Sequence, residues 1–228
     1  MLSYMNGILL VDKPSGWTSF DVVAKVRGIV RRETGLKKPK VGHTGTLDPL
    51  ATGLLVLVVG SYTKRVPELT KLDKTYEVSM TLGQVSTTGD EEGEKTAISD
   101  RMPQEVDIQQ CLQNLEGEME QTPPIFSAIK VNGQRAYKLA RAGKPVVIEP
   151  RKVEIYSITD VEYTYPLVKF TTEVSSGTYI RTLVEDIGKQ LDVGAYMSGL
   201  RRTKVGDFNI IGAQTVDDLQ DKGLNLLK

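Results

Sequence analysis

The spacing of apolar residues along the chain predicts both helices and strands. Apolar positions recur at helical spacing between residues 18 and 35 and between residues 180 and 191, so a helix is expected in each stretch. Unbroken or alternating apolar runs instead predict strands. Five such runs occur, at residues 7–11, 54–59, 74–82, 152–161 and 167–175.

Polar residues and glycines mark where these elements begin and end. Thr18 and Asp21 form a capping box at the start of the first helix, and Gly35 can end it. Asn132-Gly133 follows the run 125–131 and predicts a hairpin with a two-residue turn. Shorter helices are expected at residues 104–115, at 136–142 and after a cap formed by Thr215 and Asp218.

The remaining stretches are expected to be connections. Residues 40–53 show no clean period and are predicted to form an ordered loop, and residues 89–100 an exposed acidic connection. Helices and strands mix without strict βαβ alternation, which favours an α+β (mixed α/β) fold. No repeat or linker interrupts residues 1–228, so a single domain is predicted.

Composition narrows the class of protein. Charged residues make up 25% of the 228 residues and hydrophobic residues 39%, as in globular proteins. The longest apolar run, residues 54–59, is far shorter than the roughly 20 residues that span a bilayer. The first residues include neither the basic region nor the apolar segment that are typical of a secretory signal. A single cysteine, Cys111, and a single histidine, His43, argue against internal disulfides and Cys/His zinc sites. A cytoplasmic protein is therefore expected.

A net charge of zero hides an uneven distribution of charge. Residues 25–40 contain seven basic residues and one acidic residue, and residues 130–152 repeat those counts. Residues 90–120 contain ten acidic residues and two basic ones. Such segregation can present a positive face to a polyanion, although two solvated helical surfaces would give the same counts.

Two glycine-bounded segments concentrate residues that can carry chemistry. In the first, Gly42 to Gly53, three glycines and a proline specify an unusual backbone path, and Pro49 favours extended geometry at Asp48. Asp48 is thus a candidate functional carboxylate. Taken alone, an Asp-Pro pair is more often the N-cap and first residue of a short helix.

The second segment runs from Ser176 to Leu183. Gly177 permits close approach of another group, and the helix that follows begins with unpaired N–H groups. Tyr179 and Arg181 could together hold a planar, anionic ligand. In isolation, a surface arginine beside a half-buried tyrosine is the more common explanation.

In sequence order, these segments resemble motifs of the TruB family of tRNA pseudouridine synthases, which isomerise the uridine at position 55 in the tRNA T-loop. The resemblance covers roughly residues 7–210 and is specific because several motifs occur in the family's order. The matching segments are residues 10–19, 42–53, 74–76, 82–83, 121–130, 136–143, 177–183 and 200–208. The resemblance implies a central, mostly antiparallel mixed sheet flanked by helices, with an inserted thumb at about residues 122–152.

The resemblance also implies the catalytic group. The reaction breaks the bond between ribose C1′ and uracil N1, turns the base and rejoins it through C5, and it neither adds nor removes atoms. No cofactor or metal is therefore expected. Asp48 would be the nucleophile or the group that stabilises a developing positive charge at C1′. The sequence leaves open whether it attacks the sugar, attacks the base or removes the C2′ proton. Arg181 would stabilise its charge.

The resemblance further implies residues that bind the substrate. Tyr76 would stack on the extruded uracil, Tyr179 and Leu200 would line its pocket, and His43 would contact the region vacated by the flipped base. Basic residues would contact the RNA backbone of the tRNA T-arm. The candidates for these backbone contacts are Lys13, Arg31, Arg32, Lys64, Lys130, Arg141 and Arg202.

Two features differ from the family pattern. Ser176 stands where the family usually has a lysine, and the sequence after the last motif has room for one helix, so no C-terminal PUA-like RNA-binding domain is expected. The favoured hypothesis is a stand-alone, monomeric tRNA enzyme with no obligate protein partner and no membrane association. The alternatives are a non-catalytic RNA-binding or RNA-folding module and the catalytic subunit of a guide-RNA-dependent particle.

Overall fold

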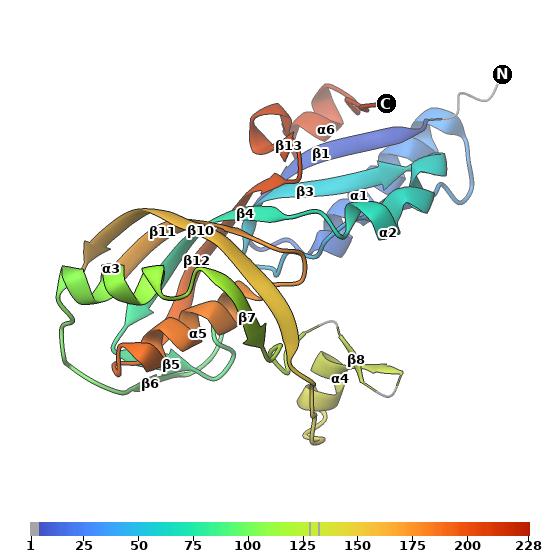
Figure 1. Ribbon diagram of the computed structural model, residues 1–228. Helices are drawn as coiled ribbons and strands as arrows, with labels where there is room; N and C mark the ends of the chain where they lie inside the picture. Colours follow the sequence, from blue (N-terminus) through green and yellow to red (C-terminus); the bar gives the residue numbers. More distant parts are fainter. Residues whose placement is uncertain (1–4, 128, 132) are drawn as a thin grey trace. The chain divides into compact units, whose positions relative to one another are not determined.

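The protein forms two compact units in a computed structural model that describes residues 5–127, 129–131 and 133–228, without the side chains of residues 137 and 141 (Figure 1). Unit 1 contains the chain up to Glu77 and again from Leu200 onward, and unit 2 contains Val78–Gly199. Two long strands, β4 (Lys74–Leu82) and β12 (Ala195–Val205), contribute residues to both units.

Unit 1 is built around two long antiparallel strands, β1 and β3. Its elements are β1 (Gly7–Lys13), α1 (Ser19–Thr34), β2 (Val41–His43), β3 (Thr52–Val59), η1 (Gly60–Arg65), α2 (Val66–Leu69), the start of β4, the end of β12, β13 (Phe208–Asn209), η2 (Ile210–Gly212), β14 (Gln214–Thr215) and α6 (Asp218–Asp221). The strand order is β14-β1-β3-β12, and β2 pairs with β3 near its C-terminal end.

The register of β1 on β3 determines which end of unit 1 carries which loops. The two strands are antiparallel, from the pair Gly7–Val59 at one end to the pair Lys13–Gly53 at the other. β12 runs parallel to β3 at that second end, where Arg202 pairs with Gly53. Alternate apolar side chains share one face of each strand and form a core. This core contains Ile8, Leu10, Leu54, Val56, Val58, Leu69 and Val205.

Helix α1 begins and ends where its capping residues predict. The Asp21 N–H donates to Thr18 Oγ1 at 3.1 Å, and the Thr18 N–H donates to Asp21 Oδ2 at 2.9 Å, which completes the capping box. Gly35 ends the helix in the left-handed region, with φ of 72°, and its N–H donates to the Arg31 carbonyl.

Unit 2 combines antiparallel strands with two longer helices. Its elements are the end of β4, β5 (Gln84–Ser86), β6 (Lys95–Ala97), α3 (Glu105–Gln113), β7 (Gly117–Gln121), β8 (Lys130–Val131), β9 (Gln134–Arg135), α4 (Ala136–Arg141), β10 (Arg151–Thr164), β11 (Leu167–Val174), α5 (Ile180–Gln190) and the start of β12. The strand order is β12-β4-β11-β10-β7, and α3 contacts both β10 and α5.

The structure confirms the predicted α+β class and most of the predicted elements. Three predictions need correction, and one long strand was not predicted. The stretch 40–53 is not entirely a loop, because it contains β2 and the first residues of β3. Among the described residues of the run 125–131, only β8 is a strand, and it pairs with β9 as the predicted hairpin requires. Residue 128 of the run and residue 132 of the predicted turn lie outside the described residues. The stretch 89–100 is not simply exposed, because it contains β6 and the buried Asp90. The long strand β12 was not predicted, because its central positions alternate neither in polarity nor in burial.

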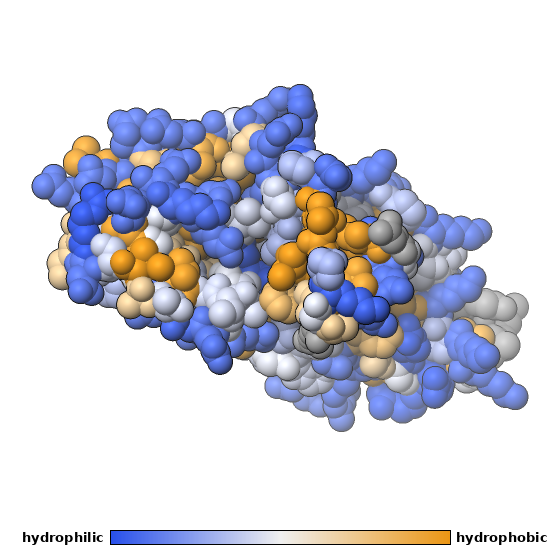
Figure 2. All heavy atoms as spheres, turned by 90° about the horizontal axis from the view of Figure 1, so that it is seen from below, coloured by the Kyte–Doolittle hydropathy of each residue, from blue (hydrophilic) through white to orange (hydrophobic). Residues whose placement is uncertain are grey.

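In Figure 2, hydrophilic residues cover most of the face shown, and apolar side chains gather in separate patches between them. No helix among the described residues is long and apolar enough to cross a membrane.

Candidate functional site

Asp48 lies in the ordered loop between β2 and β3. The Ala51 N–H donates to the Asp48 carbonyl at 3.1 Å, which forms a tight turn, and in this described stretch no helix begins at Pro49. The ordinary alternative for the Asp-Pro pair, an N-cap, is therefore not realised. The Asp48 side chain is half-buried.

Hydrogen bonds hold the residues on both sides of Asp48. Before it, the Leu47 N–H donates to Ser19 Oγ at 2.8 Å, and that hydroxyl lies 3.0 Å from the Leu47 carbonyl. After it, the Pro49 carbonyl accepts from the Gly16 N–H at 2.9 Å and from Lys13 Nζ at 3.1 Å. The backbone of the carboxylate is thus attached to β1 and to the start of α1.

A buried arginine holds the two ends of the loop. Arg202, which is 2% exposed, donates from Nε to the Leu54 carbonyl at 2.8 Å and from Nη2 to the Gly45 carbonyl at 3.0 Å. Gly53 permits the close approach of β12: with φ of 100°, a Cβ there would lie 2.3 Å from the Arg202 carbonyl oxygen. Gly53 is therefore required by packing as well as by backbone conformation.

Lys13 lies beneath the same loop and is fully buried. Its ammonium group donates to the carbonyls of Pro14, Trp17 and Pro49 at 2.7–3.1 Å. Burial lowers the pKa of Lys13 to about 8; the negative charge of Asp48 opposes this shift, and the positive charge of Arg202 adds to it.

Two of the predicted phosphate contacts are wrong. Lys13 and Arg202 are buried, and the donors described above are bonded to backbone carbonyls, so they are not available to an RNA phosphate. Both residues position the loop that carries Asp48. Arg31, Arg32, Lys64 and Lys130 are exposed, whereas the side chain of Arg141 lies outside the described residues.

Three further predicted site residues lie in unit 1. His43 ends β2, where it pairs with Leu57 of β3. Tyr76 lies on β4 and is 8% exposed. Leu200 lies on β12, and its carbonyl accepts from Thr52 Oγ1 at 3.5 Å. Unit 1 thus contains Asp48, His43, Tyr76 and Leu200, while Tyr179 and Arg181 belong to unit 2.

Tyr179 precedes α5, and neighbouring side chains hold it on two sides. The Gln121 amide accepts from the Tyr179 N–H at 2.7 Å and donates to the Tyr179 carbonyl at 3.1 Å. The guanidinium carbon of Arg151 lies 4.9 Å from the centroid of the Tyr179 ring, a cation–π distance. The Arg151 guanidinium also donates to the Gly177 carbonyl. One face of the ring is therefore covered by Arg151.

Arg181 lies in the first turn of α5 and is 6% exposed. Its Nη1 donates to the Thr88 carbonyl at 3.1 Å and its Nη2 to the Phe126 carbonyl at 3.0 Å. Its Nε lies 3.7 Å from Asp90 Oδ2, within ion-pair distance. Two neutral carbonyls and one carboxylate thus orient the guanidinium group.

Asp90 is a residue of this site that the sequence analysis did not identify. Its carboxylate accepts from Thr88 Oγ1 at 2.5 Å and from the Glu92 N–H at 3.1 Å. These two bonds fix the orientation of the carboxylate that faces Arg181. The turn-forming residues Thr88 and Gly89 just before it were the available signal. Asp90 was counted instead as part of an exposed acidic stretch.

Two protein-family models together match residues 31–225. The N-terminal domain of TruB family pseudouridylate synthases matches residues 31–180, which include Asp48, Tyr76 and Tyr179. The C-terminal domain of tRNA pseudouridylate synthase B matches residues 181–225.

Individual relatives are similar over nearly the whole chain. The tRNA pseudouridine synthase B of Pseudomonas fluorescens is 44% identical over 216 residues, which are 95% of this chain and 69% of the relative. The enzyme of the same name from Chloroherpeton thalassium is 43% identical over 216 residues, 94% of this chain and 89% of the relative.

Solved structures show the same fold. A chain of a Cbf5-Nop10-Gar1 complex superposes with a TM-score of 0.73 at 33% identity, covering 94% of this chain and 54% of that one. A chain of an H/ACA RNP bound to a substrate RNA containing 2′-deoxyuridine gives a TM-score of 0.68 at 30% identity, covering 96% and 56%. This chain thus spans just over half the length of those chains. From the family matches and the similarity to these relatives, we conclude that the chain belongs to the TruB family of pseudouridylate synthases.

Proposed function

We propose that this TruB-family tRNA pseudouridine synthase isomerises the uridine at position 55 in the T-loop of tRNA, acting without a guide RNA. The observation that carries this proposal is the anchoring of the loop around Asp48. The backbone groups of Leu47 and Pro49 are both bonded to β1 or to the start of α1, which presents the carboxylate on a rigid support. Rigid positioning of a reacting group supplies much of the rate enhancement that enzymes achieve.

Asp48 acts on the target uridine in this proposal. The C1′–N1 bond breaks, the uracil turns, and C5 forms a new bond to C1′. The proton leaves C5 and a proton is taken up at N1, so the product is an isomer of the substrate. A carboxylate serves as the nucleophile or stabilises positive charge at C1′. No redox step occurs, which is why no cofactor is invoked.

In this proposal Arg181 stabilises the negative charge of Asp48. Support for this role comes from the guanidinium itself, which is buried and oriented by the carbonyls of Thr88 and Phe126 and by the Asp90 carboxylate. Asp90 acts as a positioning residue for Arg181. Tyr76 stacks on the uracil, Tyr179 and Leu200 line its pocket, and His43 contacts the space that the flipped base leaves.

The RNA backbone is held by exposed cations. We include Arg31, Arg32, Lys64 and Lys130, which the structure leaves accessible, in this set. The protein works in the cytoplasm, where a reducing environment suits the free, buried Cys111. It works as a monomer, with the T-arm of tRNA as its partner.

Conversion of an unmodified tRNA transcript by the wild-type chain and by the Asp48→Asn variant tests the function. Pseudouridine-specific labelling followed by primer extension is expected to give one stop, in the T-loop, with the wild type. The variant is expected to give none while binding the same RNA with unchanged affinity. Asp207→Asn, an exposed residue in the turn after β12, is the matched control and should convert the transcript normally.

The same assay separates the two alternatives. A purified chain that converts tRNA with no other RNA or protein present is not the catalytic subunit of a guide-RNA-dependent particle. Tight binding without conversion by the wild type would contradict the proposal and favour a non-catalytic RNA-binding module.

A further inference from the structure

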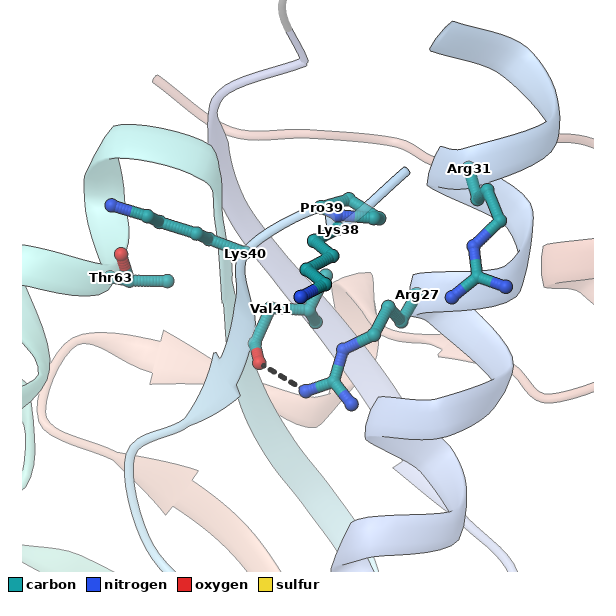
Figure 3. Close-up of a pocket in the computed structure, with 7 residues that line it drawn as sticks. All are labelled: Arg27, Arg31, Lys38, Pro39, Lys40, Val41 and Thr63. Atoms are coloured by element: carbon teal, nitrogen blue, oxygen red, sulfur yellow. Dashed lines mark hydrogen bonds between the residues drawn. The ribbon is translucent and has the colours of Figure 1, made fainter. Parts of the chain in front are cut away.

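A basic hollow lies in unit 1, between α1 and the segment that leads into β2. Its volume is about 520 Å³, and its lining residues are Arg27, Arg31, Lys38, Pro39, Lys40, Val41 and Thr63. Figure 3 shows Arg27 and Arg31 projecting from α1, and Lys38 from the facing segment, toward the same space. Lys40 points instead toward Thr63 of η1.

The charge of this hollow is uncompensated. The ion pairs among the described residues include none of its four cations. Arg27 is held in place: its Nη2 donates to the Val41 carbonyl at 3.1 Å, and its guanidinium carbon lies 5.8 Å from the centroid of the Phe20 ring. Arg31, one helical turn further along α1, and Lys38 are exposed. A fixed guanidinium beside two exposed cations suits an anion with several oxygen atoms.

The hollow lies far from the loop that carries Asp48. Val41 pairs with Val59 at the C-terminal end of β3, whereas the Asp48 loop is attached at Gly53, at the opposite end. Six residue steps along β3 separate these two ends, or about 20 Å. An anion in the hollow is therefore too distant to be the phosphate next to the reacting uridine.

Neighbouring charges indicate a polyanion rather than a small anion. Arg32 and Lys37 are chain neighbours of Arg31 and Lys38, Lys64 follows Thr63, and all three are exposed. A free phosphate would contact only the hollow, whereas an RNA strand would contact these flanking cations as well.

We propose that the hollow lined by Arg27, Arg31 and Lys38 binds a backbone phosphate of the RNA substrate, at a nucleotide other than the target. This inference rests on the proposed function for the identity of the RNA. The phosphate contact adds affinity and holds the RNA in register, and it does not take part in the isomerisation.

The test is the affinity of the full chain for unmodified tRNA, measured by filter binding over a series of salt concentrations. The test variant is Arg31→Glu/Lys38→Glu, which changes exposed side chains only. The matched control is Lys71→Glu/Lys204→Glu, which changes the charge by the same amount at two exposed positions outside the hollow. Thermal melting of all three proteins checks that each is folded.

Loss of one phosphate contact is expected to weaken binding by about tenfold at 0.1 M salt and to reduce the slope of log K against log salt by about 1. The control should match the wild type. Equal affinity and slope for test variant and control would overturn the inference. So would loss of inorganic pyrophosphate binding, measured by calorimetry, with tRNA affinity intact. Failure of the wild type to make pseudouridine would contradict the proposed function alone, since the binding comparison does not depend on conversion.

Discussion

Asp48 shows how residues distant in the chain can position a carboxylate by holding the backbone of its neighbours. Its neighbours Leu47 and Pro49 are bonded to Ser19, Gly16 and Lys13, which lie more than 25 residues earlier in the chain. Displacing a reacting group by about 1 Å can cost as much as 10²-fold in rate. Burying the Lys13 ammonium group costs free energy, and in return the group holds the Pro49 carbonyl next to Asp48. We therefore infer that Lys13 positions the Asp48 loop.

Lys13 leads to a prediction about pH. The folded protein lowers its pKa to about 8, from 10.5 as the ordinary value. Between these two values the unfolded chain holds a proton that the folded chain has lost, so the free energy of unfolding rises with pH in this range. Relative to Lys13→Met, the wild type should gain about 2 kcal/mol of stability between pH 7 and pH 9.5.

Urea unfolding of both proteins at the two pH values measures this difference. Lys71→Met, at an exposed position, is the control and should show no change in its difference from the wild type. A difference for Lys13→Met that does not change with pH would show that the buried ammonium keeps its ordinary affinity for protons.

At the scale of elements, β3 joins the core of unit 1 to the loop that carries Asp48. Seven of its eight residues are buried, and its first residues meet β1 on one side and β12 on the other. Gly53 is the point of closest approach, because a Cβ there would lie 2.3 Å from the Arg202 carbonyl oxygen. The loop therefore depends on the pairing of strands that are distant in sequence.

Gly53→Ala is expected to destabilise the protein and to lower activity. The positive φ of 100° and the overlap with β12 each oppose a side chain, and backbone strain of this kind costs about 1–3 kcal/mol. Thermal melting and the tRNA conversion assay measure the two effects. Gly28→Ala is the control: Gly28 lies within α1 with open space around it, so alanine there should raise stability by about 0.5–1 kcal/mol. Equal melting temperatures for the two variants would contradict the packing argument.

At the scale of the whole molecule, a net charge of zero conceals the charge that RNA would meet. The exposed cations Arg31, Arg32, Lys64 and Lys130 lie in or near basic stretches, while the acidic residues concentrate between residues 90 and 120. Short-range contacts to phosphates depend on local rather than net charge, because salt screens charges beyond about 10 Å.

The affinity for tRNA is therefore expected to depend steeply on salt. Four phosphate contacts would give a slope of about −3 to −4 in log K against log salt, or a loss of about 10²-fold between 50 and 200 mM. Filter binding measures this slope, and melting of the protein across the same salt range shows whether the fold is unaffected. A slope near zero would mean that these cations do not contact phosphates.

Local signals in the sequence were sufficient to predict many elements. The capping box and Gly35 predicted both ends of α1, and the unbroken apolar run predicted the buried strand β3. A helix cap involves residues three apart, and a buried strand shows as adjacent apolar residues, so both can be recognised without knowledge of the fold. The motif order from residue 10 to residue 208 was also sufficient to indicate the family.

Only the tertiary structure determined the roles of the charged residues. In the sequence, Lys13 and Arg202 resemble surface cations, and Asp90 resembles one more acid in an acidic stretch. Folding buries all three: carbonyls distant in sequence surround the first two, and Arg181 meets the third. A charged side chain can be buried where a three-dimensional arrangement supplies hydrogen-bond partners, and that arrangement is encoded by no local pattern. The sequence by itself thus determined most of the elements and the family, and the packing of distant segments decided which charges hold the Asp48 loop and which remain exposed.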